Sequence, residues 1–305
     1  MYDKSDPRAS LDPAGAKSPA YASYHPPQYI RFYEEAPQVD DGSARTWYTR
    51  GQNAITAYSE TKSRARFERQ GQADEWVLLL PDPEAAAELL VSGQSHRLAG
   101  ATITFVPPGD SELRILSGGR VVRLFTAVSQ DLAGWCGNAD AYRDADPNIP
   151  AFQPWPAPPD GFKVRSYSLD VADEPGRFGR IWRCTTFMVN YLSPNHGPRD
   201  VTQLSPHHHD DFEQYSLALR GAFIHHMRWP WTPNMKMWRN DEHEYCGTPS
   251  IAVIPPPAIH TTRALDPGVN QLVDIFSPPR IDFSQKVGWV LNAKDYPMPD
   301  SAGST

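Results

Sequence analysis

The chain has 305 residues, of which 40% are hydrophobic and 21% are charged, so it is long enough for one large domain or two ordinary ones. A net charge of −7 without a basic stripe argues against nucleic acid as a partner, and no apolar run approaches the roughly 20 residues that cross a membrane. The 31 prolines predict many loops and short strands in place of long helices.

Residues 1–45 are polar and rich in proline, and they are expected to form an N-terminal arm. The aromatic segment 21–33 within this arm predicts that it packs on the rest of the protein. The first thirty residues contain no apolar segment of the secretory type. The three cysteines show neither disulfide nor zinc-finger spacing. Together these features predict a cytoplasmic protein.

Short segments rich in β-branched and aromatic residues follow along the chain, separated by Gly and Pro turns. This pattern is typical of an all-β sandwich or barrel. The segments are 55–59, 76–80, 102–107, 121–128, 185–192, 215–219, 222–229, 251–255 and 271–276. Residues 82–90, with the sequence DPEAAAELL, predict instead a short helix.

The sequence also repeats itself. The segment GWCGNADAY at 134–142 reappears as GWVLNAKDY at 288–296, and ITFVPPGDSEL at 103–113 parallels SIAVIPPPAIHT at 250–261. Likewise ADEWVLLL at 73–80 matches FEQYSLAL at 212–219 when Trp76 is set against Tyr215. The chain therefore reads as two homologous halves. The predicted divisions are an arm at 1–45, a first domain at 46–142, a Pro-rich linker at 143–165, a second domain at 166–297 and a tail at 298–305.

The segment PHHHDDFEQ at 206–214 concentrates imidazoles and carboxylates. Alternate residues of a strand face the same side, so His207 and His209 can point together into a barrel. Glu213 introduces the next strand and can project toward the same interior. His260 follows a strand and a rigid proline turn. Three neutral imidazoles and one carboxylate suit one divalent Mn, Fe, Co, Ni, Cu or Zn ion.

These residues resemble the two motifs of the cupin superfamily. The order H-x-H-x₃-E, then Gly221 eight residues later, then P-x-x-x-x-H matches that family, although Pro257 stands where its second motif usually has Gly. Two such units in one chain resemble a bicupin. The resemblance implies two double-stranded β-helix (jelly-roll) barrels in tandem with few short helices, a homodimer, and His207, His209, Glu213 and His260 as metal ligands.

The first half does not contain the histidines. The repeat sets Glu68, Gln70, Asp74 and Glu112 at the four ligand positions. This pattern predicts a degenerate cupin domain with a structural or dimerising role. Three acids and an amide also leave open a site for a hard cation such as Ca²⁺ or Mg²⁺.

A segment rich in Trp, Met and His at 222–245 lies between the two motifs of the second half. Aromatic and thioether side chains near a metal would form an apolar pocket, and an arginine there could hold a carboxylate. Packing in the core is the alternative interpretation of these tryptophans. The candidate pocket residues are Tyr215, His226, Arg228, Trp229 and Trp238.

Three functions remain open from the sequence. The first is an iron- or manganese-dependent dioxygenase acting on a small aromatic or dicarbonyl compound. The second is a non-oxidative metal-dependent isomerase or lyase acting on a sugar acid or keto acid. The third is a bicupin that binds a small molecule without turnover. The cupin fold hosts all three, so the resemblance does not choose among them.

Overall fold

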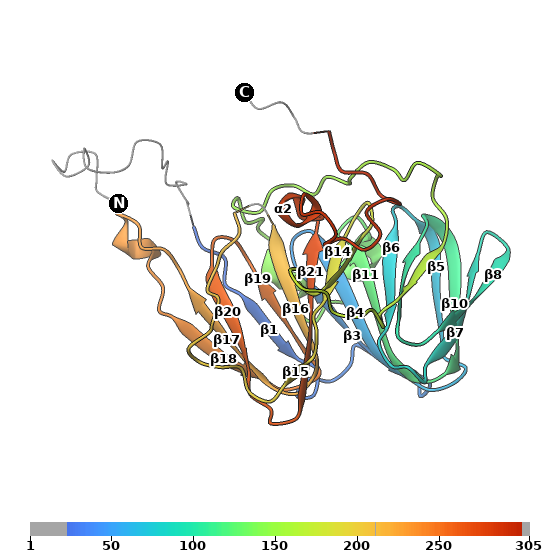
Figure 1. Cartoon of the computed structure of the whole chain (residues 1–305), viewed down its shortest axis with the longest axis horizontal. Helices are drawn as coiled ribbons and strands as arrows, with labels where there is room; N and C mark the ends of the chain where they lie inside the picture. The colour runs from blue at the N-terminus through green and yellow to red at the C-terminus, as the bar shows by residue number, and fades with distance from the viewer. Residues whose placement is uncertain (1–22, 211, 301–305) are drawn as a thin grey trace.

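The computed structural model describes residues 23–210 and 212–300, which form two antiparallel β-barrels side by side (Figure 1). Residues 1–22 of the predicted arm and 301–305 of the predicted tail lie outside the described residues. Each barrel has one seven-stranded sheet that faces the other barrel and one smaller outer sheet. Within the described residues, no helix is long and apolar enough to span a membrane.

The inner sheet of the second half runs in the order β1, β19, β16, β21, β14, β13, with β15 also paired to β21. The bounds are β1 (Gln28–Arg31), β19 (Ser250–Ile254), β16 (Glu213–Arg220), β21 (Val269–Ser277), β14 (Met188–Tyr191), β13 (Arg180–Arg183) and β15 (Asn195–His196). Its outer sheet consists of β18 (Glu242–Cys246), β17 (Phe223–Arg228) and β20 (Ile259–Ala264).

The first half repeats this plan. Its inner sheet has the order β12 (Arg165–Ser168), β9 (Thr102–Val106), β6 (Trp76–Leu80), β11 (Gly119–Thr126), β4 (Ala54–Thr61), β3 (Ala44–Arg50) and β2 (Val39–Asp40). Its outer sheet has the order β5 (Arg66–Gln72), β10 (Gly109–Ser117), β7 (Ala86–Val91) and β8 (Gln94–Ala99). The helices are α1 (Gln130–Ala133), η2 (Ala139–Tyr142), η3 (Met235–Met237) and α2 (Ile281–Ser284).

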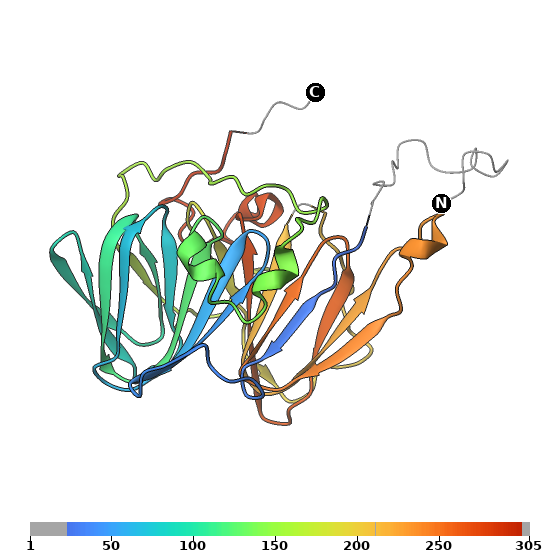
Figure 2. The same cartoon turned by 180° about the vertical axis from the view of Figure 1, so that it is seen from behind.

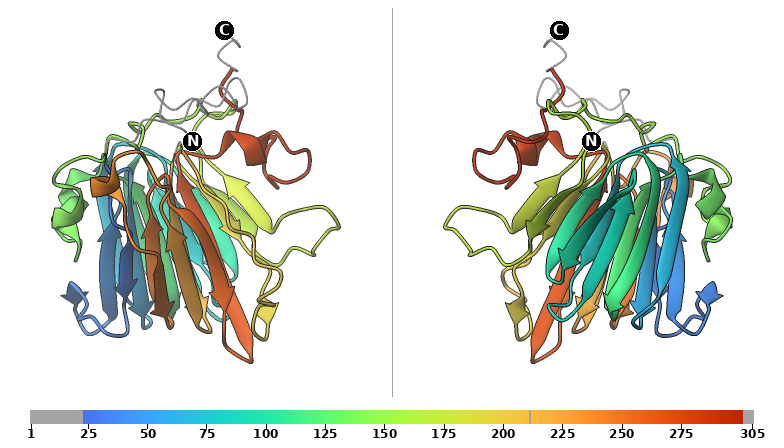
Figure 3. Two further views of the ribbon diagram at one scale, coloured as in Figure 1. Left: turned by 90° about the vertical axis from the view of Figure 1, so that its left-hand side faces the viewer. Right: turned by 90° about the vertical axis from the view of Figure 1, so that its right-hand side faces the viewer.

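The short helices lie outside the sheets. Figure 2 shows α1 and η2, in green, in front of the first-half strands. Figure 3 shows α2, in red, at one end of the strand layers. The all-β architecture with few short helices predicted from the sequence is confirmed.

The two halves exchange strands. The arm strand β1 pairs with β19 of the second half, and β12, which lies across the predicted linker boundary, pairs with β9 of the first half. Phe32, just after β1, is buried and stacks on Tyr58 of the first half with the ring centroids 5.0 Å apart. Strand β1 and Phe32 of the arm therefore pack against the two barrels.

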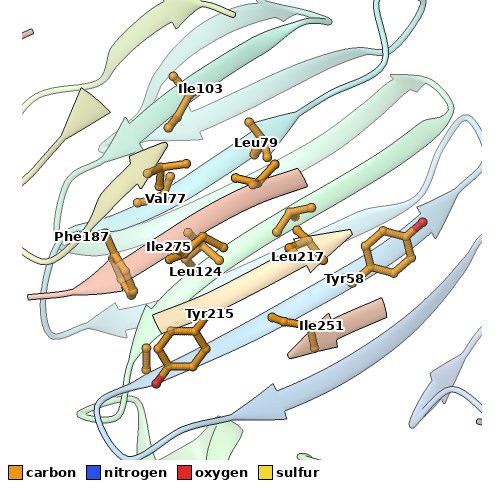
Figure 4. Close-up of a cluster of buried hydrophobic side chains, with 14 of the residues drawn as sticks. Tyr58, Val77, Leu79, Ile103, Leu124, Phe187, Tyr215, Leu217, Ile251 and Ile275 are labelled. Carbon is orange, nitrogen blue, oxygen red and sulfur yellow. The ribbon is translucent and has the colours of Figure 1, made fainter. Parts of the chain in front are cut away.

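The largest apolar cluster lies between the two inner sheets (Figure 4). Tyr215, Leu217 and Ile251 of the second half meet Tyr58, Val77 and Leu79 of the first half in this cluster. Alternate residues of β16 face this interface because side chains of a strand alternate between its two faces. The residues between them face the interior of the second barrel, and this alternation decides which side chains reach the candidate site.

The helix predicted over residues 82–90 is wrong, because this segment leads into the strand β7. Buried and half-buried residues alternate along β7, with Ala87, Leu89 and Val91 buried in the first barrel. Its pairing with both β10 and β8 supplies backbone hydrogen bonds on two sides. These tertiary contacts outweigh the helix preference of Ala, Glu and Leu.

Candidate metal centre

His207, His209 and His260 come together at the second barrel. Their ligand nitrogens all lie within 4.8 Å of one another. The backbones of His207 and His260 form a two-way bridge, with N–O distances of 3.1 and 2.7 Å. His209 and His260 are buried, whereas His207 is exposed. The neighbouring His208 is also exposed, and its Nε2 lies 3.6 Å from Asp210.

Backbone carbonyls fix the protonation of two of these imidazoles. Nδ1 of His207 lies 2.9 Å from the Ser205 carbonyl, and Nδ1 of His260 lies 2.9 Å from the Ala258 carbonyl. Since a carbonyl only accepts hydrogen bonds, both Nδ1 atoms carry the proton. The Nε2 lone pair of each neutral ring is then free for a metal ion, as in other metal sites where the outer nitrogen is held by a carbonyl.

Gln214, the second residue of β16, supplies a fourth donor. Its Nε2 donates to the Ser216 hydroxyl at 3.0 Å and to the Asp274 carboxylate at 3.2 Å. The amide oxygen Oε1 therefore faces the histidines, 3.0 Å from Nε2 of His209 and 3.3 Å from Nε2 of His260. Donor atoms that share one divalent ion at about 2.1 Å are about 3.0–3.4 Å apart, so these distances fit a common ion.

The contact between His260 and Gln214 brings two acceptor atoms together. Nε2 of His260 holds a lone pair because Nδ1 holds the proton, and the amide oxygen is also an acceptor. Two acceptors at this separation repel one another unless a positive charge lies between them. A proton on His260 is disfavoured in this buried position, so the three imidazoles and the amide oxygen form a donor set that suits a divalent metal ion.

The surroundings keep the buried imidazoles neutral. Burial, with a smaller contribution from the nearby Arg280 guanidinium, lowers the pKa of His209 to about 2. Burial likewise lowers the pKa of His260 to about 3. Arg280 is held by an ion pair with Asp282 at 2.7 Å and lies 3.6 Å from the ring centre of Phe283. Neutral imidazoles are the form that binds a metal.

These lowered pKa values predict how stability depends on pH in the metal-free protein. The unfolded chain takes up a proton at His260 below about pH 6.5, whereas the folded chain does so only near pH 3. The free energy of unfolding should therefore decrease as the pH is lowered through this interval. In the His260→Asn variant, its slope against pH should be smaller by up to about 1.4 kcal/mol per pH unit. Urea denaturation with EDTA between about pH 4 and 7 measures both slopes. Equal slopes would contradict the prediction.

The structure does not bring Glu213 to the histidines. Its side chain is fully buried between the two barrels, where Oε2 accepts hydrogen bonds from the backbone N–H groups of Gln52 and Asn53 at 2.8 and 3.2 Å. The Tyr215 hydroxyl donates to the same oxygen at 2.9 Å. Burial raises the pKa of Glu213, and the hydrogen bonds from these partners oppose that rise.

The displacement of Glu213 comes from a shift of one residue. β16 begins at Glu213, so Glu213 and Tyr215 face the interface while Gln214 faces the barrel interior. The same shift of one residue changes the alignment between the two halves. The ladders pair Gln214 with Ile254 and Trp76 with Val106, each immediately before the proline turn. Trp76 therefore corresponds to Gln214, not to Tyr215, and it fills the first barrel by stacking on Phe125.

The first half does not gather the acids that the repeat set at the ligand positions. Glu112 forms an ion pair with Arg114 at 2.7 Å, beside the exposed Glu68 on the outside of the barrel. Gln70 is exposed, and Asp74 accepts hydrogen bonds from Gln72 and Thr126. Over residues 23–210 and 212–300, the histidine group is the one cluster of three or more His, Cys, Asp or Glu side chains with ligand atoms close together, so these acids of the first half are not gathered in one place.

A cavity of about 410 Å³ opens onto His207 and His260. One part of its wall is polar and the other is apolar. The polar residues include His207, His260, Gln214, Asp274, Arg199, Asn195 and Asn270, and the apolar residues include Phe178, Leu192, Phe223 and Leu272. The Asp274 carboxyl accepts a hydrogen bond from Ser216 at 2.6 Å, and burial raises its pKa.

None of the five predicted pocket residues belongs to the wall of this cavity. Tyr215 lies in the interface between the barrels, and Trp229 is buried beneath Arg239. His226 faces outward, with its Nδ1 2.8 Å from that of His243, while its neighbour His225 faces inward. The exposed Arg228 pairs with Asp241, and the exposed Trp238 stacks on Trp231.

Gln214, Asp274 and Arg199 of this site are not predicted from the sequence. Gln214 directly follows the glutamate that was chosen, so only the start of the strand distinguishes the two residues. Asp274 stands opposite Ser216 in the ladder between β16 and β21, which a correct pairing of the two strands would have found. Arg199 precedes the first strand of the site by a long loop, and nothing in the sequence distinguishes it from other arginines.

No family model and no curated protein matches the sequence. Solved structures show the same fold. AerE from Microcystis aeruginosa aligns over 83% of this chain and 97% of its own, with a TM-score of 0.53 and 11% identity. The oxalate decarboxylase–formate complex of Lactobacillus farciminis aligns over 83% and 86%, with a TM-score of 0.54 and 12% identity. The 7S globulin of Momordica charantia aligns over 83% and 84%, with a TM-score of 0.52 and 12% identity. By these likenesses the chain has the bicupin fold, with two cupin-type barrels in tandem, as the resemblance implied.

Proposed function

We propose that this chain is a metal-dependent enzyme, with a divalent ion held by His207, His209, His260 and Gln214. The observation that carries the proposal is the facing pair of acceptors, Nε2 of His260 and Oε1 of Gln214, 3.3 Å apart. A divalent ion satisfies both lone pairs, together with those of the other two imidazoles. Mixed nitrogen and oxygen donors of this kind suit Mn, Fe, Co, Ni, Cu or Zn.

The donor set favours non-oxidative chemistry. All four donors are neutral, so an ion held by them keeps its full charge, and it would supply Lewis-acid polarisation of a carbonyl or carboxylate oxygen. Asp274 lies in the same cavity wall. Its bonds to Ser216 and Gln214 hold its carboxyl in place, and they also hold the amide oxygen toward the histidines. The proposed reaction class is therefore isomerisation, lyase cleavage or decarboxylation of a keto acid or sugar acid.

An oxygenase of a small aromatic or dicarbonyl compound is the second candidate. The tryptophans and methionines of the segment that suggested it do not line the cavity, and Trp231 and Met235 are exposed at a hairpin. The apolar part of the cavity wall, which includes Phe178 and Phe223, still favours a substrate with an aromatic or aliphatic body. Iron as the native metal belongs to this second candidate.

Metal content tests the proposal directly. Untagged wild-type protein should contain about one equivalent of a first-row metal by elemental analysis, because four donors converge on one position. His260→Ala should lose that metal, whereas His96→Ala, in β8 of the first barrel, should retain it. Retention of metal by His260→Ala would contradict the four-donor centre.

Oxygen dependence separates the two enzymatic candidates. Protein loaded with each metal can be incubated anaerobically and aerobically with a panel of keto acids, sugar acids and phenolic compounds. Conversion without O₂ supports the isomerase, lyase or decarboxylase. Conversion that requires O₂ supports the oxygenase, and binding without conversion supports a non-catalytic bicupin.

The homodimer and the cytoplasmic location remain predictions.

A further inference from the structure

Arg199 lies in the wall of the metal-centre cavity with part of its guanidinium unused. Its Nη1 donates to the Thr262 carbonyl at 3.0 Å, and its Nη2 donates to the Gln203 carbonyl at 3.1 Å and to the Ser205 hydroxyl at 3.0 Å. A guanidinium has five N–H donors. The Nε–H and one Nη1–H of Arg199 therefore have no partner among residues 23–210 and 212–300.

The charge of Arg199 is also uncompensated. All three acceptors are neutral groups, and no carboxylate within the described residues forms an ion pair with it. Some other arginines of this half do have such partners. Arg228 pairs with Asp241 and Arg239 pairs with Glu242. Hydrogen bonds to fixed backbone groups hold the guanidinium of Arg199 in one orientation and leave its charge available to a ligand.

Arg199 is joined to the metal centre through one residue. Ser205 accepts a hydrogen bond from Arg199 through its hydroxyl, and its carbonyl holds Nδ1 of His207 at 2.9 Å. Arg199, His207 and His260 line the same cavity, whose remaining wall includes Phe178, Phe223 and Leu272. A cation, a metal centre and an apolar surface thus meet in one space of about 410 Å³.

We infer that the substrate is a carboxylate with an apolar or aromatic body, and that Arg199 binds the carboxylate. This inference rests on the proposed metal-dependent function of the same cavity. The free Nε–H of Arg199 can donate a single charge-assisted hydrogen bond to a carboxylate oxygen, and the guanidinium charge adds to its strength. Arg199 is therefore the residue that selects an acid over the corresponding neutral compound, a role that Arg228 cannot fill from the outer face of the sheet.

The test compares 3-phenylpropionate with its neutral counterpart 3-phenylpropionamide, using the full chain loaded with Co²⁺ and isothermal titration calorimetry. Wild-type protein should bind the acid about tenfold or more tightly than the amide, the size expected for one charged hydrogen-bonded pair. Arg199→Gln should reduce this preference about tenfold while the affinity for the amide stays the same. Arg199→Lys should keep part of the preference, and the matched control Arg228→Gln should keep all of it.

The outcomes distinguish this inference from the proposed function. The same titrations are repeated with metal-free protein, and the Co²⁺ content of each variant is measured. No preference for the acid in wild-type protein, including no binding of either compound, overturns the role of Arg199. An Arg199→Gln variant with wild-type preference and wild-type metal content overturns it as well. Failure of wild-type protein to hold Co²⁺ overturns the metal centre alone, because the acid preference of the metal-free protein still reports on Arg199.

Discussion

Replacing Gln214 by leucine should weaken Co²⁺ binding by at least about 10- to 100-fold, the loss found when even an outer partner of a metal ligand is removed. Glu213→Gln should change the affinity by less than about threefold, well short of that loss. The reason is the strand alternation of β16, which points the Gln214 oxygen at His209 and His260 and points Glu213 at the other barrel. Equilibrium dialysis with elemental analysis, together with the visible absorption of bound Co²⁺, measures both affinities.

A third variant makes this comparison sharper. Gln214→Glu keeps an oxygen donor at the same place and adds a negative charge, so it should bind Co²⁺ at least as tightly as wild-type protein. The opposite ranking, with metal lost in Glu213→Gln and retained in Gln214→Leu, would show that the glutamate is the ligand. Circular dichroism on each variant separates loss of metal from loss of fold.

Replacing Glu75 by alanine should lower the free energy of unfolding by about 2–5 kcal/mol, because it leaves several buried donors without an acceptor. The Glu75 carboxylate accepts hydrogen bonds from the N–H and hydroxyl of Thr185, both at 3.0 Å, and from the Tyr296 hydroxyl at 2.7 Å. It is fully buried and joins the first barrel to the second. Urea denaturation of the metal-free protein measures the loss.

Glu213→Ala should produce a loss of similar size, because the two glutamates occupy equivalent positions in the two halves. Glu213 reaches the backbone of Gln52 and Asn53 in the first half, just as Glu75 reaches Thr185 in the second. The exposed Glu84 is the matched control, and Glu84→Ala should stay within about 0.5 kcal/mol of wild type. If Glu75→Ala unfolded at the same urea concentration as Glu84→Ala, the buried carboxylate would not be stabilising the contact between the barrels.

This equivalence explains what the repeated segments at 134–142 and 288–296 do. Asn138 exchanges two hydrogen bonds with the backbone of Arg50, at 2.8 and 2.9 Å, and Asn292 does the same with Arg183, at 2.8 and 3.0 Å. The tyrosine that ends the second segment, Tyr296, donates to Glu75. The tyrosine that ends the first, Tyr142, lies beside Glu213 and acts on its pKa. Each half thus supplies a segment that supports the buried glutamate of the other half.

Much of the fold could be predicted from the sequence. The apolar segments predicted as strands all lie in or overlap strands of the barrels, because alternation and proline turns are local properties. The helix predicted over residues 82–90 was wrong because these residues favour a helix in isolation. Only pairing with the neighbouring strands β8 and β10 makes the segment a strand. The exchange of β1 and β12 between the halves was equally out of reach, since strand pairing is a property of the assembled sheets.

The candidate site, like the fold, could be predicted from the sequence only in part. The sequence by itself predicted the three histidines that the structure brings together, from the H-x-H spacing and the proline turn before His260, although residues 207–209 form an isolated bridge and a loop and not the expected strand. Only the tertiary structure decided between Glu213 and Gln214, since a shift of one residue moves a side chain from one face of a strand to the other. It also decided that the tryptophans of the hairpin do not line the cavity and that Arg199 does. These facts depend on how loops distant in sequence fold over a barrel, and no local pattern encodes them.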